Sequence, residues 1–149
     1  MKTIIFSWVL AATFANSAIT ADGKGFFPVM VQVVNAESRT PIKGVKVRLE
    51  GAGDYKEVEL DPQRQMKNLP ESLGKVVETN NEGVAVVFYY GGWSIRTVDA
   101  KTAYSRKLLG TVIVEIEGKE MYRKTLEAWV QENAFQVDAI TVPWIVVSL

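Results

Sequence analysis

The sequence predicts an all-β protein, a Greek-key β-sandwich of about seven to eight strands with one optional short helix. Stretches rich in β-branched and aromatic residues recur along the chain, separated by turns rich in Gly, Asn and Pro. One stretch, residues 45–50, alternates apolar Val and Leu with charged residues, as a half-buried strand does. Because many short strands and turns also suit a barrel, that architecture remains the alternative.

The first 18 residues have the order of a secretory signal peptide. Lys2 supplies a positive charge, an apolar run fills residues 3–14, and small residues follow between 15 and 18. We expect cleavage after residue 17 or 18, with Ala21 as a further option. A membrane anchor is the alternative, but an apolar run of about a dozen residues is shorter than the roughly 20 that span a bilayer. We therefore expect a periplasmic or extracellular protein without a membrane span once the signal peptide is removed.

Composition narrows the chemistry available to the chain. Its 149 residues include no cysteine and no histidine, and 17 Lys plus Arg balance 17 Asp plus Glu. The missing residues exclude disulfides, thiolate metal sites and histidine-based catalysis built from this chain alone. Balanced charge argues against a nucleic-acid partner. The length predicts a single domain, residues 26–149, with enough core to fold without disulfides.

The amino-terminal half reads as strands and turns. Residues 19–25 are small and polar, which predicts a flexible lead-in, and residues 26–34 are the first strand. Pro28 must lie at the start of that strand or on a sheet edge, because proline donates no ladder hydrogen bond. After the strand at 45–50, a short strand is expected at 55–60. A long loop then follows at 61–74.

The strongest strand signal is the run VAVVFYY at residues 84–90. It follows a short strand at 75–79 and a turn at 80–83, and it is apolar on both faces. We favour burial of both faces in the protein core. The alternative is that one face contacts a partner chain.

The carboxyl-terminal half continues the pattern. Gly91-Gly92 is expected to break the strand before 93–98 resumes it, and Glu117-Gly118 joins strands at 111–116 and 119–126 as a hairpin. Residues 126–134 also fit a short helix. The chain ends in a hydrophobic strand at 140–149. Basic side chains of the late hairpin are expected to protect a sheet edge: Lys119, Arg123 and Lys124.

Three motifs give residues 31–95 a resemblance to a known family. They are Thr40-Pro41-Ile42-Lys43-Gly44-Val45 between two strands, the turn Thr79-Asn80-Asn81-Glu82-Gly83, and Gly92-Trp93-Ser94-Ile95 at a strand start. Together they resemble the carboxypeptidase regulatory-like, transthyretin-like Greek-key sandwiches of bacterial envelopes. The resemblance implies a non-catalytic stabilising or interaction module. Immunoglobulin-like sandwiches remain the alternative fold.

Few residues stand out as a site. Tyr89, Tyr90 and Trp93 flank two glycines and could form an exposed aromatic cluster that stacks on sugar rings or anchors a protein, with core packing as the favoured interpretation. Trp129 and Trp144 could form another exposed patch, with core packing again the default. We predict no catalytic group, no metal site and no cofactor.

These observations lead to two hypotheses of function. The first is an exported, non-enzymatic binding or assembly module of the bacterial envelope, with a protein partner or a second copy of the chain as its ligand. The alternative is a carbohydrate-binding module that holds a polysaccharide through Tyr89, Tyr90 and Trp93. A hydrolase using carboxylates alone has no support in their spacing, because the sequence contains no recognisable catalytic pair.

Overall fold

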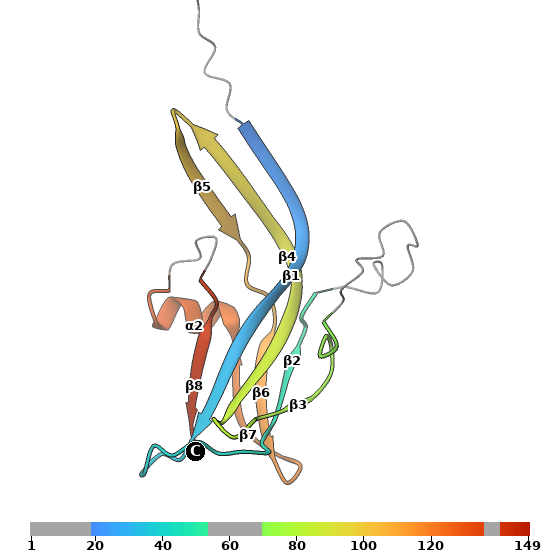
Figure 1. Ribbon diagram of the computed structural model, residues 1–149, viewed down its shortest axis with the longest axis vertical. Helices are drawn as coiled ribbons and strands as arrows, with labels where there is room; N and C mark the ends of the chain where they lie inside the picture. The colour runs from blue at the N-terminus through green and yellow to red at the C-terminus, as the bar shows by residue number, and fades with distance from the viewer. Residues whose placement is uncertain (1–18, 54–69, 136–140) are drawn as a thin grey trace, which may run out of the picture.

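The computed structural model describes residues 19–53, 70–135 and 141–149, which form two packed β-sheets (Figure 1). Sheet A has the strand order β5-β4-β1-β8, and sheet B has the order β3-β2-β6-β7. The elements, in chain order, are β1 (Ile19–Val34), β2 (Lys46–Glu50), β3 (Val77–Glu78), β4 (Val84–Val98), β5 (Lys101–Arg106), β6 (Thr111–Ile116), β7 (Lys119–Thr125), α2 (Leu126–Glu132) and β8 (Trp144–Ser148). The predicted all-β sandwich with one short helix is confirmed. The predicted signal peptide, the strand at 55–60 and most of the loop at 61–74 lie outside the described residues.

The core is built from alternate residues of the facing strands. In each sheet, successive side chains point to opposite faces, and one set of alternate residues is buried. Sheet A contributes Val29, Val31, Val33, Ala85, Val87, Tyr89, Ile145 and Val147, and sheet B contributes Val47, Leu49, Val112 and Val114. These β-branched side chains suit a pleated sheet and bury apolar surface, which is the main favourable term in folding.

Local geometry confirms the predicted hairpin of sheet B and decides between strand and helix in the segment that follows it. Glu117 and Gly118 adopt positive φ angles of 51° and 79°, as a two-residue hairpin turn requires. The hairpin ends at a helix: the Thr125 hydroxyl accepts a hydrogen bond from the Ala128 N–H and caps α2. Leu126 and Trp129 then turn into the core. The helical interpretation of residues 126–134 is therefore correct for most of that range.

The strand β7 lies at the edge of sheet B and carries the basic residues predicted to protect an edge. A register shift in its pairing with β6 falls between Val114 and Glu115. Basic side chains and bulges both discourage another strand from adding to an edge.

Two predictions about the other sheet are wrong. Residues 19–25 are not a flexible lead-in but the first part of β1, and Gly91-Gly92 does not interrupt β4. The two strands pair antiparallel without a register break from Ile19↔Thr97 to Gln32↔Val84. Neither Gly91 nor Gly92 adopts a positive φ. Pairing along this long ladder therefore keeps the glycine-rich residues in strand conformation, although glycine has a low intrinsic preference for strands.

The strand β5 was not predicted. Its sequence, KTAYSR, is mostly polar, and it joins β4 through Asp99 and Ala100, which adopt positive φ angles of 51° and 61°. This turn has the geometry of a hairpin, but it lacks the Asn-Gly or Asp-Gly sequence that usually signals one. Pairing with β4, rather than local sequence, places β5 in the sheet.

The two turns that carry the family resemblance contact each other through Thr79. The Thr79 hydroxyl donates to the Ile42 carbonyl at 2.7 Å and accepts from the Val45 N–H at 3.0 Å. The Thr79 carbonyl also accepts from the Gly44 N–H. The Thr79 side chain is only 3% exposed, so it satisfies backbone groups that water reaches poorly.

We expect Thr79→Val to lower the free energy of unfolding by about 1–3 kcal/mol, because it leaves a buried donor and a buried acceptor without a partner. Thr79→Ser keeps the hydroxyl and should lose clearly less. Urea unfolding monitored by circular dichroism would measure both. A loss in Thr79→Ser as large as that in Thr79→Val would contradict this, because it would show that the methyl group contributes as much as the hydroxyl.

Candidate functional site

The face of sheet A that points away from sheet B is apolar. It is formed by the alternate residues of β1, β4 and β8 that do not enter the core. We call the apolar part of this face the outer face of sheet A, and it consists of Phe26, Pro28, Met30, Val84, Val86, Phe88, Tyr90, Trp144 and Val146. Gln32 and Ser148 are the polar residues at its end.

These side chains are exposed or half-buried rather than buried. Trp144 is 48% exposed and Val146 is 49% exposed, while Met30, paired with Trp144, is half-buried. Among the described residues, no second layer of strands or helices covers this face, since α2 packs beside β7. The expectation that both faces of the 84–90 strand are buried is therefore wrong. One face enters the core, and the other is a surface.

The outer face of sheet B is built differently. Arg48 contacts Glu115 at 3.2 Å and Glu50 at 2.9 Å, and Arg123 contacts Glu50 at 2.9 Å and Glu120 at 2.8 Å. Ile113, the central apolar residue of this face, pairs with both arginine positions and is fully buried. The long arginine side chains cover it and keep their charges in water. Sheet B thus presents a charged face where sheet A presents an apolar one.

The charges of sheet B tune one another's protonation. Hydrogen bonds from Arg48 and Arg123 hold the pKa of Glu50 below its usual value, and a hydrogen bond from Arg123 does the same for Glu120. In return, the carboxylates raise the pKa of Arg123. All of these groups stay charged near neutral pH and keep the face hydrated.

The three aromatic residues predicted as one cluster do not share a surface. Tyr89 is fully buried and points into the core, whereas the neighbouring Tyr90 lies on the outer face, 4.9 Å from the ring of Phe26. Trp93 lies on the same face of β4 as Tyr89 but beyond the end of sheet B, half-buried and nearly parallel to Tyr104. Strand alternation separates residues that are close in sequence.

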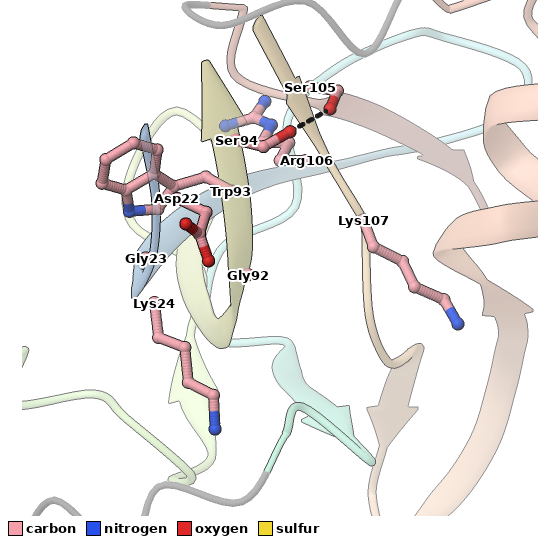
Figure 2. A pocket seen from close by; sticks show the side chains of 9 residues that line it. All are labelled: Asp22, Gly23, Lys24, Gly92, Trp93, Ser94, Ser105, Arg106 and Lys107. Atoms are coloured by element: carbon pink, nitrogen blue, oxygen red, sulfur yellow. Dashed lines mark hydrogen bonds between the residues drawn. The ribbon is translucent and has the colours of Figure 1, made fainter. Parts of the chain in front are cut away.

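Trp93 lines a shallow, open hollow of about 690 Å³ where β1, β4 and β5 leave the sandwich (Figure 2). Its indole lies across Gly23, where a Cβ would be only 2.9 Å from Cζ2 of Trp93. Ser94 and Ser105 share a hydrogen bond of 2.8 Å between neighbouring strands. The charged residues around the hollow are Asp22, Lys24, Arg106 and Lys107.

Arg106 and Tyr89 are the buried polar groups next to this hollow. The Arg106 guanidinium lies 5.2 Å from the Phe27 ring and donates to the Thr141 carbonyl. Within the described part of the chain, its Nε and the Tyr89 hydroxyl have no hydrogen-bond partner. Burial raises the pKa of Tyr89 to about 12, although the positive charge of Arg106 acts in the opposite direction.

The described residues contain no group of three or more acidic side chains arranged to hold a metal ion. In the ranges 19–53, 70–135 and 141–149, no helix is long and apolar enough to cross a membrane.

Trp144 and Val146 lie on the surface, although the sequence pattern favours core packing of this segment. The run Trp144-Ile145-Val146-Val147 is apolar at every position, so it carries no signal of which face is buried. The core interpretation is correct for Trp129, which is 9% exposed, and wrong for Trp144.

Replacing Tyr89 with Phe should change the stability of the protein at alkaline pH. In the folded chain Tyr89 keeps its proton up to pH about 12, while in the unfolded chain it loses the proton near pH 10. Rising pH therefore favours unfolding between these values, by up to about 2 kcal/mol. Tyr89→Phe should lack this loss and stay within about 1 kcal/mol of the wild type below pH 9. Urea unfolding between pH 8 and 11.5 would test this, and parallel stability curves would contradict it.

Comparison with known proteins adds no relative. No family model, no curated protein and no solved structure matches the chain.

Proposed function

We propose that the protein is a non-enzymatic binding or assembly module that docks a protein partner on the outer face of sheet A. The observation that carries this proposal is the contrast between the two outer faces. Sheet B covers its one central apolar residue with paired arginines, and sheet A leaves nine largely apolar positions without such a cover. Contiguous exposed apolar surface of this kind is rare unless a partner covers it.

The composition of the face suits protein recognition. Trp144 offers a large exposed ring beside Met30 and Val146, and aromatic and Met side chains are enriched in the cores of protein interfaces. The backbone of the sheet is already ordered by strand pairing. Such a surface binds with little loss of conformational entropy.

We also propose that the protein acts outside the cytoplasm and has no catalytic activity. The amino-terminal sequence supports export to the periplasm or exterior, and the absence of histidine and cysteine argues against the usual nucleophilic and metal chemistry. The resemblance to carboxypeptidase regulatory-like sandwiches supports a non-catalytic module. Thr79, which joins the two turns of that resemblance, uses its hydroxyl for hydrogen bonds within the fold.

Site-specific photo-crosslinking in cells that produce the protein tests the docking face. A crosslinking residue in place of Val146 should give one discrete adduct of defined mass. The same residue in place of Met121, which is 46% exposed on β7, is the matched control and should give none. Trp144→Ser should abolish the adduct at position 146. Equal labelling at both positions, or an adduct unaffected by Trp144→Ser, would contradict the proposal.

A second candidate, polysaccharide binding, is favoured by one observation. The rings of Trp93 and Tyr104 are inclined by only 5° with centroids 6.2 Å apart, and parallel aromatic rings suit stacking on sugars. This platform replaces the predicted trio, since Tyr89 is buried and Tyr90 lies on the other face.

Under this second candidate, Trp93→Ala should abolish retention on insoluble envelope polysaccharide, because half of the stacking platform is lost. Trp144→Ala removes an exposed tryptophan elsewhere and should leave retention unchanged. A pull-down assay with folded variants, checked by circular dichroism, separates the two. Identical retention of the variants and the wild type would reject carbohydrate binding at this site.

A further inference from the structure

Sheet A has an open edge along the first half of β1. The strand β8 pairs with β1 only from Met30↔Trp144 to Val34↔Ser148. Upstream of Met30, no strand among the described residues pairs with β1 on that side, and Figure 1 shows this part of β1 at the margin of a three-stranded arm. Open strand edges are templates for pairing with another chain.

The backbone groups directed at this edge can be identified. The Met30 N–H donates to the Pro143 carbonyl on the β8 side, whereas the Val33 N–H donates to the Gly83 carbonyl on the β4 side. Backbone N–H groups of successive residues point to opposite edges, and the β1–β4 register has no break. Even-numbered residues of β1 therefore direct their N–H and C=O groups outward, namely Thr20, Asp22, Lys24 and Phe26. Pro28, which has no N–H, ends the series.

We propose that this edge pairs antiparallel with the same edge of a second copy of the chain, in a register centred on Gly23. The proposal does not depend on the outer-face docking proposed above, because it concerns a different surface. In a two-fold symmetric pair, residue i opposite residue j implies j opposite i. Centring on Gly23 places Asp22 opposite Lys24 of the second copy and Thr20 opposite Phe26. All four outward-facing residues then stand in hydrogen-bonded positions.

Among the two-fold symmetric registers, the charges of Asp22 and Lys24 favour the one centred on Gly23. Shifting the centre to Asp22 would place Asp22 opposite Asp22 of the second copy, and shifting it to Lys24 would oppose two lysines. Like charges directly opposite each other destabilise a strand pair, and opposite charges stabilise it. Only the Gly23-centred register forms two Asp–Lys pairs. Both side chains are exposed and on one face of the sheet, and the Lys24 ammonium, 5.9 Å from the centroid of the Tyr90 ring, would exchange this contact for the Asp22 carboxylate of the second copy.

Trp93 also lies at the proposed contact between the two β1 edges. Its indole lies on Gly23, and Figure 2 shows it reaching across β1 toward the open edge. In the proposed pair, Gly23 stands opposite Gly23 of the second copy, so the two indoles lie on either side of the join on one face. Glycine at this position leaves the space that they need, because a side chain there would collide with the indole.

Charge reversal tests the register on protein produced from the complete sequence. Asp22→Lys and Lys24→Asp each turn both cross-strand pairs into like-charge pairs, so each variant alone should dimerise at least about tenfold more weakly than the wild type. Mixing the two variants restores opposite charges at every pair and should give a heterodimer of near wild-type affinity. The double variant Asp22→Lys/Lys24→Asp should also dimerise. Analytical ultracentrifugation would measure all four.

A monomeric wild type, or a mixture no tighter than the single variants, would overturn the proposal. Hydrogen exchange gives a residue-level check: amides of Thr20, Asp22, Lys24 and Phe26 should become protected as concentration rises, and that of Ala21, which faces β4, should not change. Trp144→Ser should leave dimerisation intact, so failure of the outer-face proposal and failure of this one give different results.

Discussion

The ladder between β1 and β4 is the interaction on which the rest of the molecule depends. These strands have 16 and 15 residues, while the longest strand of sheet B has 7. At about 3.3 Å per residue, β1 spans roughly 50 Å and sheet B little more than 20 Å. Sheet B can therefore cover only part of sheet A. The remainder projects as an arm of β1, β4 and β5, visible in Figure 1, whose residues must be stabilised without a facing sheet.

Glycine and aromatic side chains stabilise this arm together. The Trp93 indole lies on Gly23, and the Tyr89 ring lies against Gly91, where a Cβ would be 3.2 Å from Cε2 of Tyr89. Glycine alone weakens a strand, but an aromatic ring packed flat over its backbone recovers apolar contact. The glycine-rich sequence that suggested a flexible segment is therefore what lets the arm carry its own packing. The same rings account for why Tyr89 is buried and Trp93 is not: sheet B ends between them.

Sequence reasoning succeeded where local patterns decide the structure. Alternation at residues 45–50, the Glu117-Gly118 turn and the helical pattern at 126–134 all act within a few residues, and each one specifies its element. It failed where partners distant in sequence decide. Residues 19–25 are a strand because residues 91–97 pair with them. Likewise, the uniformly apolar runs at 84–90 and 144–147 could not reveal which face is buried, because that depends on how far sheet B extends.

The unequal sheets also explain why the two candidate surfaces occur on one sheet. A strand long enough to outrun its neighbour β8 must expose an edge, and a sheet covered on one face must expose the other. In sheet B, both edges and the outer face are protected. The edge strand β3 has only two residues, the edge strand β7 is basic and has a register shift, and arginines cover Ile113 on the outer face. Among the described residues, sheet A carries Pro28 at its open edge and one lysine, Lys24, over the Tyr90 ring of its outer face, where sheet B has a network of paired arginines. The features that discourage association are therefore concentrated in sheet B, which is the distribution expected of a molecule whose partners bind to sheet A.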